Sequence, residues 1–311
     1  EIELLDQSLT ELKESYERKA KEFSDILKMA RTQLQDAVPI TLGQEFQAFA
    51  VSTSKDIERL HELLPLLAEV NLGGTAVGTE LNTPRGYTKK VVAELSKLSG
   101  VKLTSAKDLV EATQSSGVLV TFSSVLKRIA VKQSKIASDL RLLSSGPRAG
   151  LNEINLPEKQ AGSSIMPGKV NPVVPEVINQ IAFTVIGNDL TVTMAAESGQ
   201  LQLNAFEPIM ARSILMSITY LRNGFATFTK NCVDGIEPNV DLLKAAVENS
   251  IGLVTVLSPK LGYENATKVA RYAKKNDCSV RQAVVDLNLM TEAEFESALG
   301  DLISIARRSA G

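Results

Sequence analysis

One short segment, residues 162–172, gathers side chains that can bind an anion and move a proton. It reads GSSIMPGKVNP. Gly162 and Gly168 permit backbone conformations that are closed to other residues, so consecutive amides there can point toward one anion. Lys169 adds a positive charge and Asn171 a directional amide, and the two together suit a carboxylate. A loop of these residue types can therefore bind a carboxylate.

Two adjacent hydroxyls, Ser163 and Ser164, complete the set. A hydroxyl surrounded by amides and a cation ionises more readily than a free serine, because these groups stabilise the alkoxide. The chemistry would then be proton abstraction beside a bound carboxylate. Composition alone favours a second interpretation, in which the segment is a flexible, solvated connector rich in Ser, Gly and Pro.

The elements on either side of this loop have the spacing of amphipathic helices. Apolar residues recur at steps of three and four, which predicts long helices over residues 2–30, 43–70, 117–144, 176–196 and 208–232. Pro65 should kink or shorten the second of them. Residues 145–175 have little helical pattern, and an irregular segment of this length inside a compact domain is usually functional.

Shorter helices are expected in the rest of the chain, and no stretch shows a convincing strand alternation. Their predicted ranges are 87–98, 106–114, 240–249, 260–276, 279–287 and 291–299. Thr291 and Glu294 form the sequence pattern of a capping box at the start of the last one. We therefore expect an all-α fold, with a long-helix bundle domain over residues 1–239 that contains the loop and a small C-terminal helical domain over residues 240–311.

The composition excludes several functional classes. The 311 residues are 44% hydrophobic, and 34 Lys and Arg are interspersed with 36 Asp and Glu, so the chain lacks a nucleic-acid footprint. Cys232 and Cys278 lack the spacing of a zinc site or a disulfide framework, which suggests free thiols in a reducing compartment. No apolar run approaches the roughly 18 residues of a membrane span, and residues 1–14 are too charged for a signal peptide. We expect a cytoplasmic protein with no nucleic-acid or membrane partner.

The loop resembles a known signature. SS-x-MP-x-K-x-N is the pattern of the aspartase/fumarase superfamily of lyases, and six or more positions of the loop agree with it in order. Further similar segments are RTQLQDA at 31–37, LLSSGPRAGLNEI at 142–154, VVPEVINQ at 173–180 and QLQLN at 200–204. Essentially the whole chain can be placed on the family, which favours the binding loop over the connector.

Two branches of the family compete, aspartate ammonia-lyases and class II fumarases. Many members, including fumarases, have histidine where this chain has Gln33, whereas some aspartases have glutamine there. The residues after Pro172 also look like aspartase. The resemblance thus implies reversible deamination of L-aspartate to fumarate and ammonia, with fumarase-type hydration as the alternative. It implies neither a cofactor nor a metal.

The resemblance also implies how the loop would act. Ser163 would be the general base, acting as an alkoxide on a weakly acidic proton next to the side-chain carboxylate. The resulting aci-carboxylate dianion would be bound by Ser164 and by the amides near Ile165 and Met166, which are donors already in place. Catalysis would depend on this preorganised charge stabilisation.

Further substrate-binding residues follow from the same resemblance. Lys169, Asn171 and Thr32 would hold the second carboxylate, and Gln33 would lie near the amino group. An amide side chain has no useful pKa for proton donation, so the amine would leave without strong acid assistance. Glu176 pairs with the histidine in members that have one; here it either supports the site or interacts with a helix dipole.

Three differences from the family bear on these expectations. Two substrate-binding motifs that precede the matched region in family chains have no counterpart here, so roughly a third of a family chain is expected to be absent. Glu80 stands where the family usually has glycine, and a positive φ there would strain it. Ala30 also replaces a common glycine.

The family implies an assembly as well. Its sites are built from three subunits of a homotetramer whose long helices form a common core, and the apolar surface of the helices expected here fits such an assembly. Without the preceding motifs, an alternative is an inactive helical oligomerisation scaffold.

Overall fold

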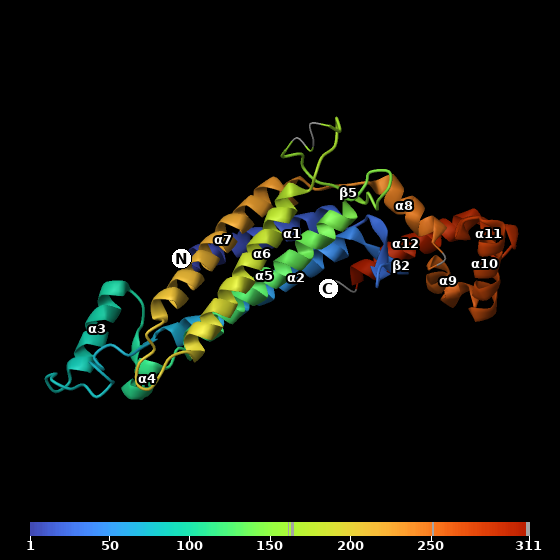
Figure 1. The fold of residues 1–311 in the computed structure, drawn as a ribbon. Coiled ribbons are helices and arrows are strands. Elements are labelled where there is room, and N and C mark those ends of the chain that lie inside the picture. Colours follow the sequence, from blue (N-terminus) through green and yellow to red (C-terminus); the bar gives the residue numbers. More distant parts are fainter. Residues whose placement is uncertain (161, 163–164, 251, 309–311) are drawn as a thin grey trace. The chain divides into compact units, whose positions relative to one another are not determined.

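Long helices dominate the structure (Figure 1). The computed structural model describes residues 1–160, 162, 165–250 and 252–308. The long helices are α1 (Ile2–Glu22), α2 (Leu42–Leu67), α5 (Gly117–Leu143), α6 (Val173–Glu197) and α7 (Glu207–Asn231). The shorter ones are α3 (Tyr87–Ser99), α4 (Leu109–Gln114), α8 (Val240–Asn249), α9 (Leu253–Leu261), α10 (Tyr263–Asn276), α11 (Val280–Asp286) and α12 (Glu292–Arg308). The predicted all-α class is confirmed, and α2 ends soon after Pro65, as the sequence suggests.

The first predicted helix is too long. It was expected to reach Ala30, but α1 ends at Glu22 and a strand, β1 (Leu27–Thr32), follows. Leu27 and Ala30 fit the helical spacing and yet lie on this strand, because β1 pairs with β2 (Gln35–Thr41) in an antiparallel hairpin. The prediction for residues 260–276 is also corrected, since Gly262 has a φ of 77° and separates α9 from α10.

The remaining strands contain two residues each. β3 (Glu69–Val70) pairs in parallel with β4 (Thr104–Ser105), and β5 (Ile154–Asn155) pairs antiparallel with β6 (Glu237–Pro238). A short 3-10 turn, η1 (Val233–Gly235), precedes β6. Pairs this short leave no alternation in the sequence, which explains why no strand is predicted there.

The chain folds as two compact units. The first contains residues 1–12, 52–138 and 173–228, and the second contains residues 13–51, 139–172 and 229–311. Several long helices therefore contribute residues to both.

Polar side chains join the helices of the first unit. Asp189 of α6 accepts a hydrogen bond from Ser123 of α5 (2.9 Å) and pairs with Lys127. Asp56 of α2 pairs with Lys132 of α5 (2.9 Å), and burial raises the pKa of its carboxyl group. Because buried carboxylates are costly without partners, these pairs favour one alignment of α2, α5 and α6.

The second unit has an aromatic core beneath the hairpin. Tyr16 of α1 and Phe23, which directly follows α1, meet Phe46 and Phe49 of α2. The ring centroids are 5.3 Å apart for Phe23 and Phe46 and 5.7 Å apart for Tyr16 and Phe49. Such edge-to-face pairs are favourable beyond the area they bury. Cys232, also buried here, is a free thiol whose pKa is raised to about 12 by burial, so it stays protonated.

The C-terminal helices of the second unit share a hydrophobic core of their own. Its buried residues come from α8 to α12 and include Leu257, Val269 and Phe295. The capping box predicted for α12 is confirmed: the Thr291 amide donates to Glu294 Oε2 (2.7 Å), and the Glu294 amide donates to the Thr291 hydroxyl (3.3 Å).

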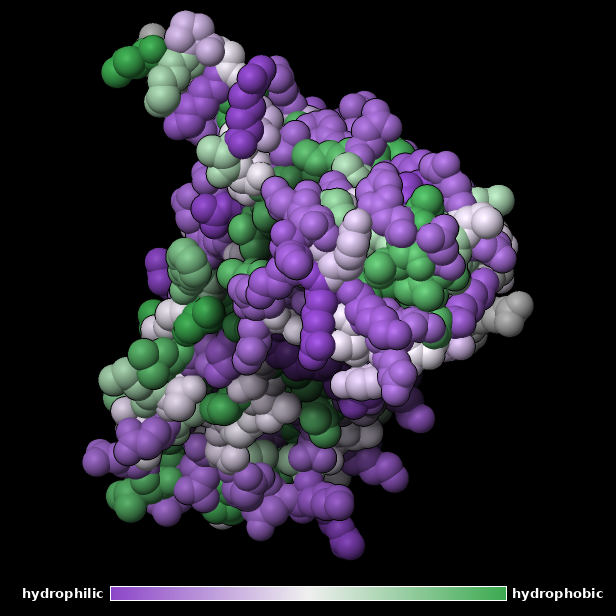
Figure 2. Space-filling model, turned by 90° about the vertical axis from the view of Figure 1, so that its right-hand side faces the viewer, coloured by the Kyte–Doolittle hydropathy of each residue, from purple (hydrophilic) through white to green (hydrophobic). Residues whose placement is uncertain are grey.

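Large apolar side chains also reach the surface. On the face shown in Figure 2, hydrophobic side chains form separate patches between hydrophilic ones. Along α6, Phe183, Leu190 and Met194 are each more than 60% exposed. Among the described residues, no helix is both long and apolar enough to cross a membrane.

Glu80 and Ala30, which stand where the family usually has glycine, differ in backbone conformation. Glu80 has a φ of 55°, so the strain expected for a side chain at this position is present. Its carboxylate accepts a hydrogen bond from the Thr88 hydroxyl, which holds the turn. Ala30 lies on β1 without a positive φ and carries no such strain.

Candidate active site

The loop predicted to bind a carboxylate is closed at its neck by its own residues. Asn171 Nδ2 donates to the Gly162 carbonyl oxygen (3.1 Å), and the Lys169 amide donates to the Met166 carbonyl oxygen (3.2 Å). A methyl group on Gly162 would overlap the Lys169 carbonyl oxygen, so only glycine fits there. Gly168 has a φ of 78°, which favours glycine for a second reason.

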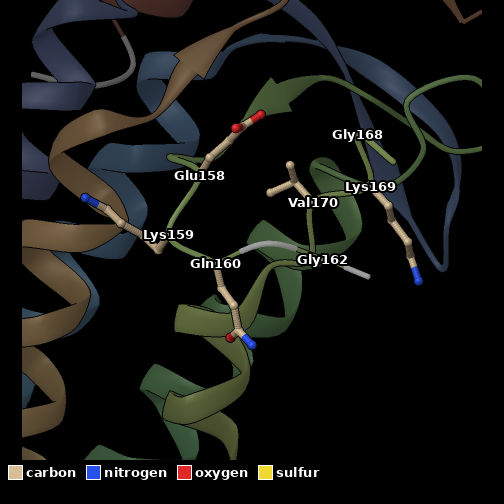
Figure 3. A pocket seen from close by; sticks show the side chains of 7 residues that line it. All are labelled: Glu158, Lys159, Gln160, Gly162, Gly168, Lys169 and Val170. Carbon is tan, nitrogen blue, oxygen red and sulfur yellow. The ribbon is translucent and has the colours of Figure 1, made fainter. Parts of the chain in front are cut away.

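An open pocket lies beside this neck (Figure 3). It has a volume of about 420 Å³ and is lined by Glu158, Lys159, Gln160, Gly162, Gly168, Lys169 and Val170. Two of these side chains are cationic and one is anionic. The lining therefore has one more cationic than anionic side chain, and Lys159 and Lys169 extend in opposite directions in Figure 3.

The loop residues that would touch substrate differ in their exposure to solvent, and two of them are not described. Ser163 and Ser164 lie outside the described residues. Ile165 is 86% exposed and Met166 is 49% exposed, while Lys169 is exposed and Asn171 half-buried. Exposed donors compete with water, so this loop would need a cover to stabilise charge strongly.

Thr32 and Gln33 lie at the tip of the β1–β2 hairpin, with exposed side chains. Thr32 pairs with Gln35, which leaves Gln33 and Leu34 as a two-residue turn. Both have positive φ, 53° and 63°, the backbone of a type I′ turn, which usually contains Asn or Gly. A positive φ is sterically unfavourable for glutamine and leucine, so the surrounding structure must hold the turn in place.

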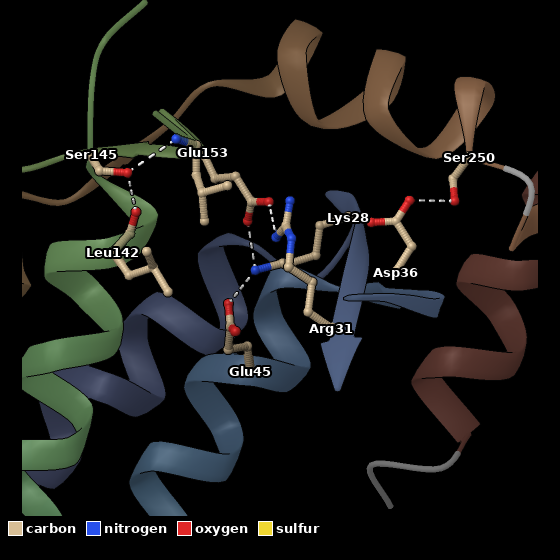
Figure 4. Close-up of polar contacts among 9 residues, drawn as sticks. Lys28, Arg31, Asp36, Glu45, Leu142, Ser145, Glu153 and Ser250 are labelled. Carbon is tan, nitrogen blue, oxygen red and sulfur yellow. Dashed lines mark hydrogen bonds and ion pairs between the residues drawn. The ribbon is translucent and has the colours of Figure 1, made fainter. Parts of the chain in front are cut away.

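A buried cluster of charges holds the base of this hairpin (Figure 4). Lys28 is 2% exposed, and its Nζ lies 2.8 Å from Glu45 Oε2 and 2.7 Å from Glu153 Oε2. Arg31 pairs with the other oxygen of Glu153, which is itself 1% exposed. Two cations thus face two carboxylates. Sequence reasoning missed this cluster because it treated Lys28 as part of a helix.

Glu153 is fixed through its backbone as well. Its amide donates to the Leu143 carbonyl oxygen at the end of α5 (2.8 Å), and its carbonyl oxygen accepts from the Asn239 amide (2.9 Å). Just before it, the Ser145 hydroxyl donates to the Leu142 carbonyl oxygen (2.6 Å) and accepts from the Leu151 amide (3.0 Å). The segment that leads from α5 toward the loop is therefore ordered by hydrogen bonds.

The hairpin is held on a second side by the C-terminal helices. The Ser250 hydroxyl, which follows α8, donates to Asp36 Oδ2 on β2 (2.8 Å). Gly252 lies so close to the Ala37 carbonyl oxygen that a methyl group there would overlap it. The hairpin is thus attached both to the segment before the loop and to the C-terminal helices.

The structure does not join the two groups of predicted residues within one chain. In the described part of the chain, no hydrogen bond or ion pair links Thr32 or Gln33 to Lys169 or Asn171. Glu176 lies in the first turn of α6, in the first unit, and is half-buried.

Comparison with known proteins decides the family. A family model described as "Lyase" matches residues 1–187, and one described as "Fumarase C C-terminus" matches residues 253–300. The chain belongs to the aspartase/fumarase superfamily of lyases. It is 53% identical over 295 residues to aspartate ammonia-lyase from Escherichia coli, and 54% identical over 293 residues to that of Pseudomonas aeruginosa.

Solved structures of lyases have the same fold. The fumarate lyase:delta crystallin from Brucella melitensis, solved with bound cobalt, matches with a TM-score of 0.94 at 50% identity over 98% of this chain and 66% of that one. A class II fumarase from Schistosoma mansoni matches with a TM-score of 0.87 at 32% identity over 95% of this chain and 65% of that one.

The matches to the two bacterial aspartate ammonia-lyases cover nearly all of this lyase chain but not all of the relatives. They include 95% and 94% of this chain, whereas the chain spans 62% of the length of either relative.

Proposed function

We propose that the protein containing this chain is an aspartate ammonia-lyase, which converts L-aspartate reversibly to fumarate and ammonia. The observation that carries the proposal is the 53% identity to an aspartate ammonia-lyase across 95% of the chain. The 32% identity to a class II fumarase is much lower, which supports deamination over hydration. The amide at Gln33, in place of a histidine, agrees with an amine leaving group that needs no strong acid.

The reaction requires removal of a proton from a carbon beside a carboxylate, which is difficult because that proton is weakly acidic. In our proposal, Ser163 takes the proton, while Ser164 and the amides of Ile165 and Met166 bind the charge that develops on the carboxylate. Donors fixed before the reaction are typically worth about 3–4 kcal/mol each in such sites. The glycines of the loop support this role, since they let backbone amides approach an anion.

The second carboxylate would be held by Lys169, Asn171 and Thr32, with Gln33 beside the amino group. Lys169 lines the pocket at the loop neck, which supports its role as the cationic anchor. Asn171 donates one amide hydrogen to Gly162 and keeps a second for a ligand. Glu176, near the start of α6, would support the site from the helix end.

We propose a homotetramer that shares its sites between subunits. The apolar stripe on α6 supports this, because Phe183, Leu190 and Met194 recur at helical spacing and are more than 60% exposed. Shared sites would also explain why, among the described residues, no hydrogen bond or ion pair joins Thr32 or Gln33 to Lys169 or Asn171 of the same chain. Sedimentation that detects only monomers would contradict the shared-site proposal.

Two further proposals concern organisation and location. We divide the chain into a bundle domain over residues 1–239 and a small domain over residues 240–311, supported by the hydrophobic core that α8 to α12 share. We place the protein in the cytoplasm, where free thiols such as Cys232 and Cys278 are common.

The test is to incubate the full-length protein with L-aspartate or with L-malate and to follow fumarate by its ultraviolet absorbance. We expect fumarate from L-aspartate and much less from L-malate. Faster turnover of L-malate would favour the fumarase alternative. No turnover of either by folded protein would favour an inactive oligomerisation scaffold.

A further inference from the structure

The chain departs from regular strand geometry between Lys28 and Thr32, next to the proposed substrate contacts. The register of the hairpin shifts between Met29, which pairs with Pro39, and Arg31, which pairs with Asp36. Such irregularities turn a strand and change the direction of the side chains that follow it. The direction of the hairpin tip is therefore set at this point.

One carboxylate contacts the chain on both sides of the irregularity. Glu153 Oε2 lies 2.7 Å from Nζ of Lys28, which precedes it, and Oε1 pairs with Arg31, which follows it. Glu153 and Lys28 are almost completely buried. Because water cannot replace these contacts, the cluster fixes the hairpin more firmly than a surface ion pair would.

The backbone of Glu153 is fixed by hydrogen bonds, so its carboxylate can hold the hairpin in place. Its backbone is bonded to Leu143 at the end of α5 and to Asn239 beside β6, and the next two residues form β5. The backbone of Glu153 is thus held by two other segments of the second unit, the end of α5 and residues 237–239. A strained turn at Gln33 and Leu34 needs such a support, since a positive φ at both positions would relax in a free hairpin.

We propose that Glu153 is a positioning residue, which holds the hairpin tip so that Thr32 and Gln33 meet the substrate in the productive orientation. This inference rests on the proposed aspartate ammonia-lyase function. Glu153 does not touch substrate; it acts through Lys28 and Arg31. Small misplacement of binding groups reduces turnover by up to about 100-fold in other enzymes, so we expect a loss of about 10-fold to 100-fold without Glu153.

The test compares three variants of the full-length protein. Glu153→Gln removes the central charge and keeps the shape of the side chain. Arg31→Gln removes only the partly exposed contact after the irregularity and leaves Lys28 paired, so we expect it to disturb folding less than Glu153→Gln does. Asp189→Asn is the control, because Asp189 is also a buried carboxylate bound by two side chains, but it lies on α6 in the first unit.

Two measurements are made on each variant. The first is kcat/KM for L-aspartate at a temperature where the helical circular dichroism is unchanged. The second is amide hydrogen exchange of peptides from residues 27–41. We expect Glu153→Gln and Arg31→Gln to lower kcat/KM by about 10-fold or more and to accelerate exchange in the hairpin, and Asp189→Asn to do neither.

Unchanged hairpin exchange in both variants would overturn the positioning role, as would a kcat/KM within twofold of the unmodified protein. A failure of the proposed function is recognised separately, because the unmodified protein would then make no fumarate from L-aspartate. In that case the exchange measurement alone still decides whether Glu153 fixes the hairpin.

Discussion

The loop at residues 162–172 and the hairpin at residues 27–41 carry the residues proposed to bind substrate, and they are built in opposite ways. Residues 165–170 of the loop are exposed, and a hydrogen bond between Asn171 and Gly162 joins its two ends. The hairpin is attached to other segments by the Glu153 cluster and by the bond from Ser250 to Asp36.

The difference between the loop and the hairpin suggests a separate role for each in the proposed reaction. A base and its anion-binding amides must exclude water during the chemical step, which requires a segment able to close over the substrate. Groups that orient the substrate must hold still beforehand. A loop with exposed residues and a hairpin attached to neighbouring segments suit these two needs.

The largest effect should come from changing the neck of the loop. In Gly162→Ala, the new methyl group meets the Lys169 carbonyl oxygen, so the neck must open and shift Lys169 and Asn171. We expect kcat/KM for L-aspartate to fall by about 100-fold, while the melting temperature changes little because the loop is exposed.

The matched control is Gly300→Ala in α12, where a methyl group meets nothing within 4 Å. This change should leave kcat/KM intact and slightly stabilise the helix. A fall in kcat/KM of less than twofold in Gly162→Ala would show that the neck does not organise the loop.

A smaller effect should follow from weakening the C-terminal helices that contact β2. Thr291→Ala removes the hydroxyl that caps α12, and α12 packs on β2. We expect the free energy of unfolding near neutral pH to fall by about 1 kcal/mol in urea titration, with turnover preserved. A loss of kcat/KM in Thr291→Ala as large as that expected for Glu153→Gln would contradict the view that Glu153 is the main support of the hairpin.

The difference in the free energy of unfolding between the unmodified protein and Thr291→Ala should also depend on pH. The Thr291 amide and hydroxyl lower the pKa of the Glu294 carboxyl group in the folded protein. Stabilisation by a carboxylate with a lowered pKa is present above its ordinary value of 4.5 and is lost as the pH falls through the folded pKa. Thr291→Ala keeps the amide and loses only the hydroxyl, so the difference in unfolding free energy between the two proteins should narrow below pH 4.5 by the share that the hydroxyl contributes. A constant difference would argue against the bond from the Thr291 hydroxyl to the Glu294 carboxylate.

The smallest effect should come from relieving strain at the hairpin tip. Leu34 is 68% exposed with a φ of 63°, so Leu34→Gly removes a steric cost and little buried surface. We expect a gain of about 0.5 kcal/mol in the free energy of unfolding.

Leu98→Gly is the control for this change. Leu98 is 85% exposed but lies in α3, so the same substitution should cost about 1 kcal/mol. Two losses of similar size would show that the turn is not strained.

The two regions also differ in how far the sequence predicts them. Residue types alone favoured a flexible connector for the loop, and only its resemblance to the family signature made it a predicted binding loop. The long helices α2, α5, α6 and α7 were predicted because their apolar spacing persists over several turns. Local patterns are enough for features of this kind.

The hairpin was missed because the apolar spacing of residues 27–30 fits both a helix and a strand. Leu27 and Ala30 continue the helical spacing of α1, and only tertiary pairing decides in favour of a strand. Pro39, within a stretch of β-branched residues, was the available signal against a helix. The Glu153 cluster joins residues more than 100 positions apart, so no local pattern could reveal it.

The central claim is that Ser163 removes the proton from L-aspartate. The most direct test measures fumarate formation by the full-length protein, by Ser163→Ala and by Ser99→Ala, which changes an exposed serine at the end of α3. We predict that Ser163→Ala loses about 1,000-fold or more of kcat with its helical signal intact, and that Ser99→Ala keeps normal turnover. Turnover of L-aspartate by Ser163→Ala within tenfold of the unmodified protein would contradict the account.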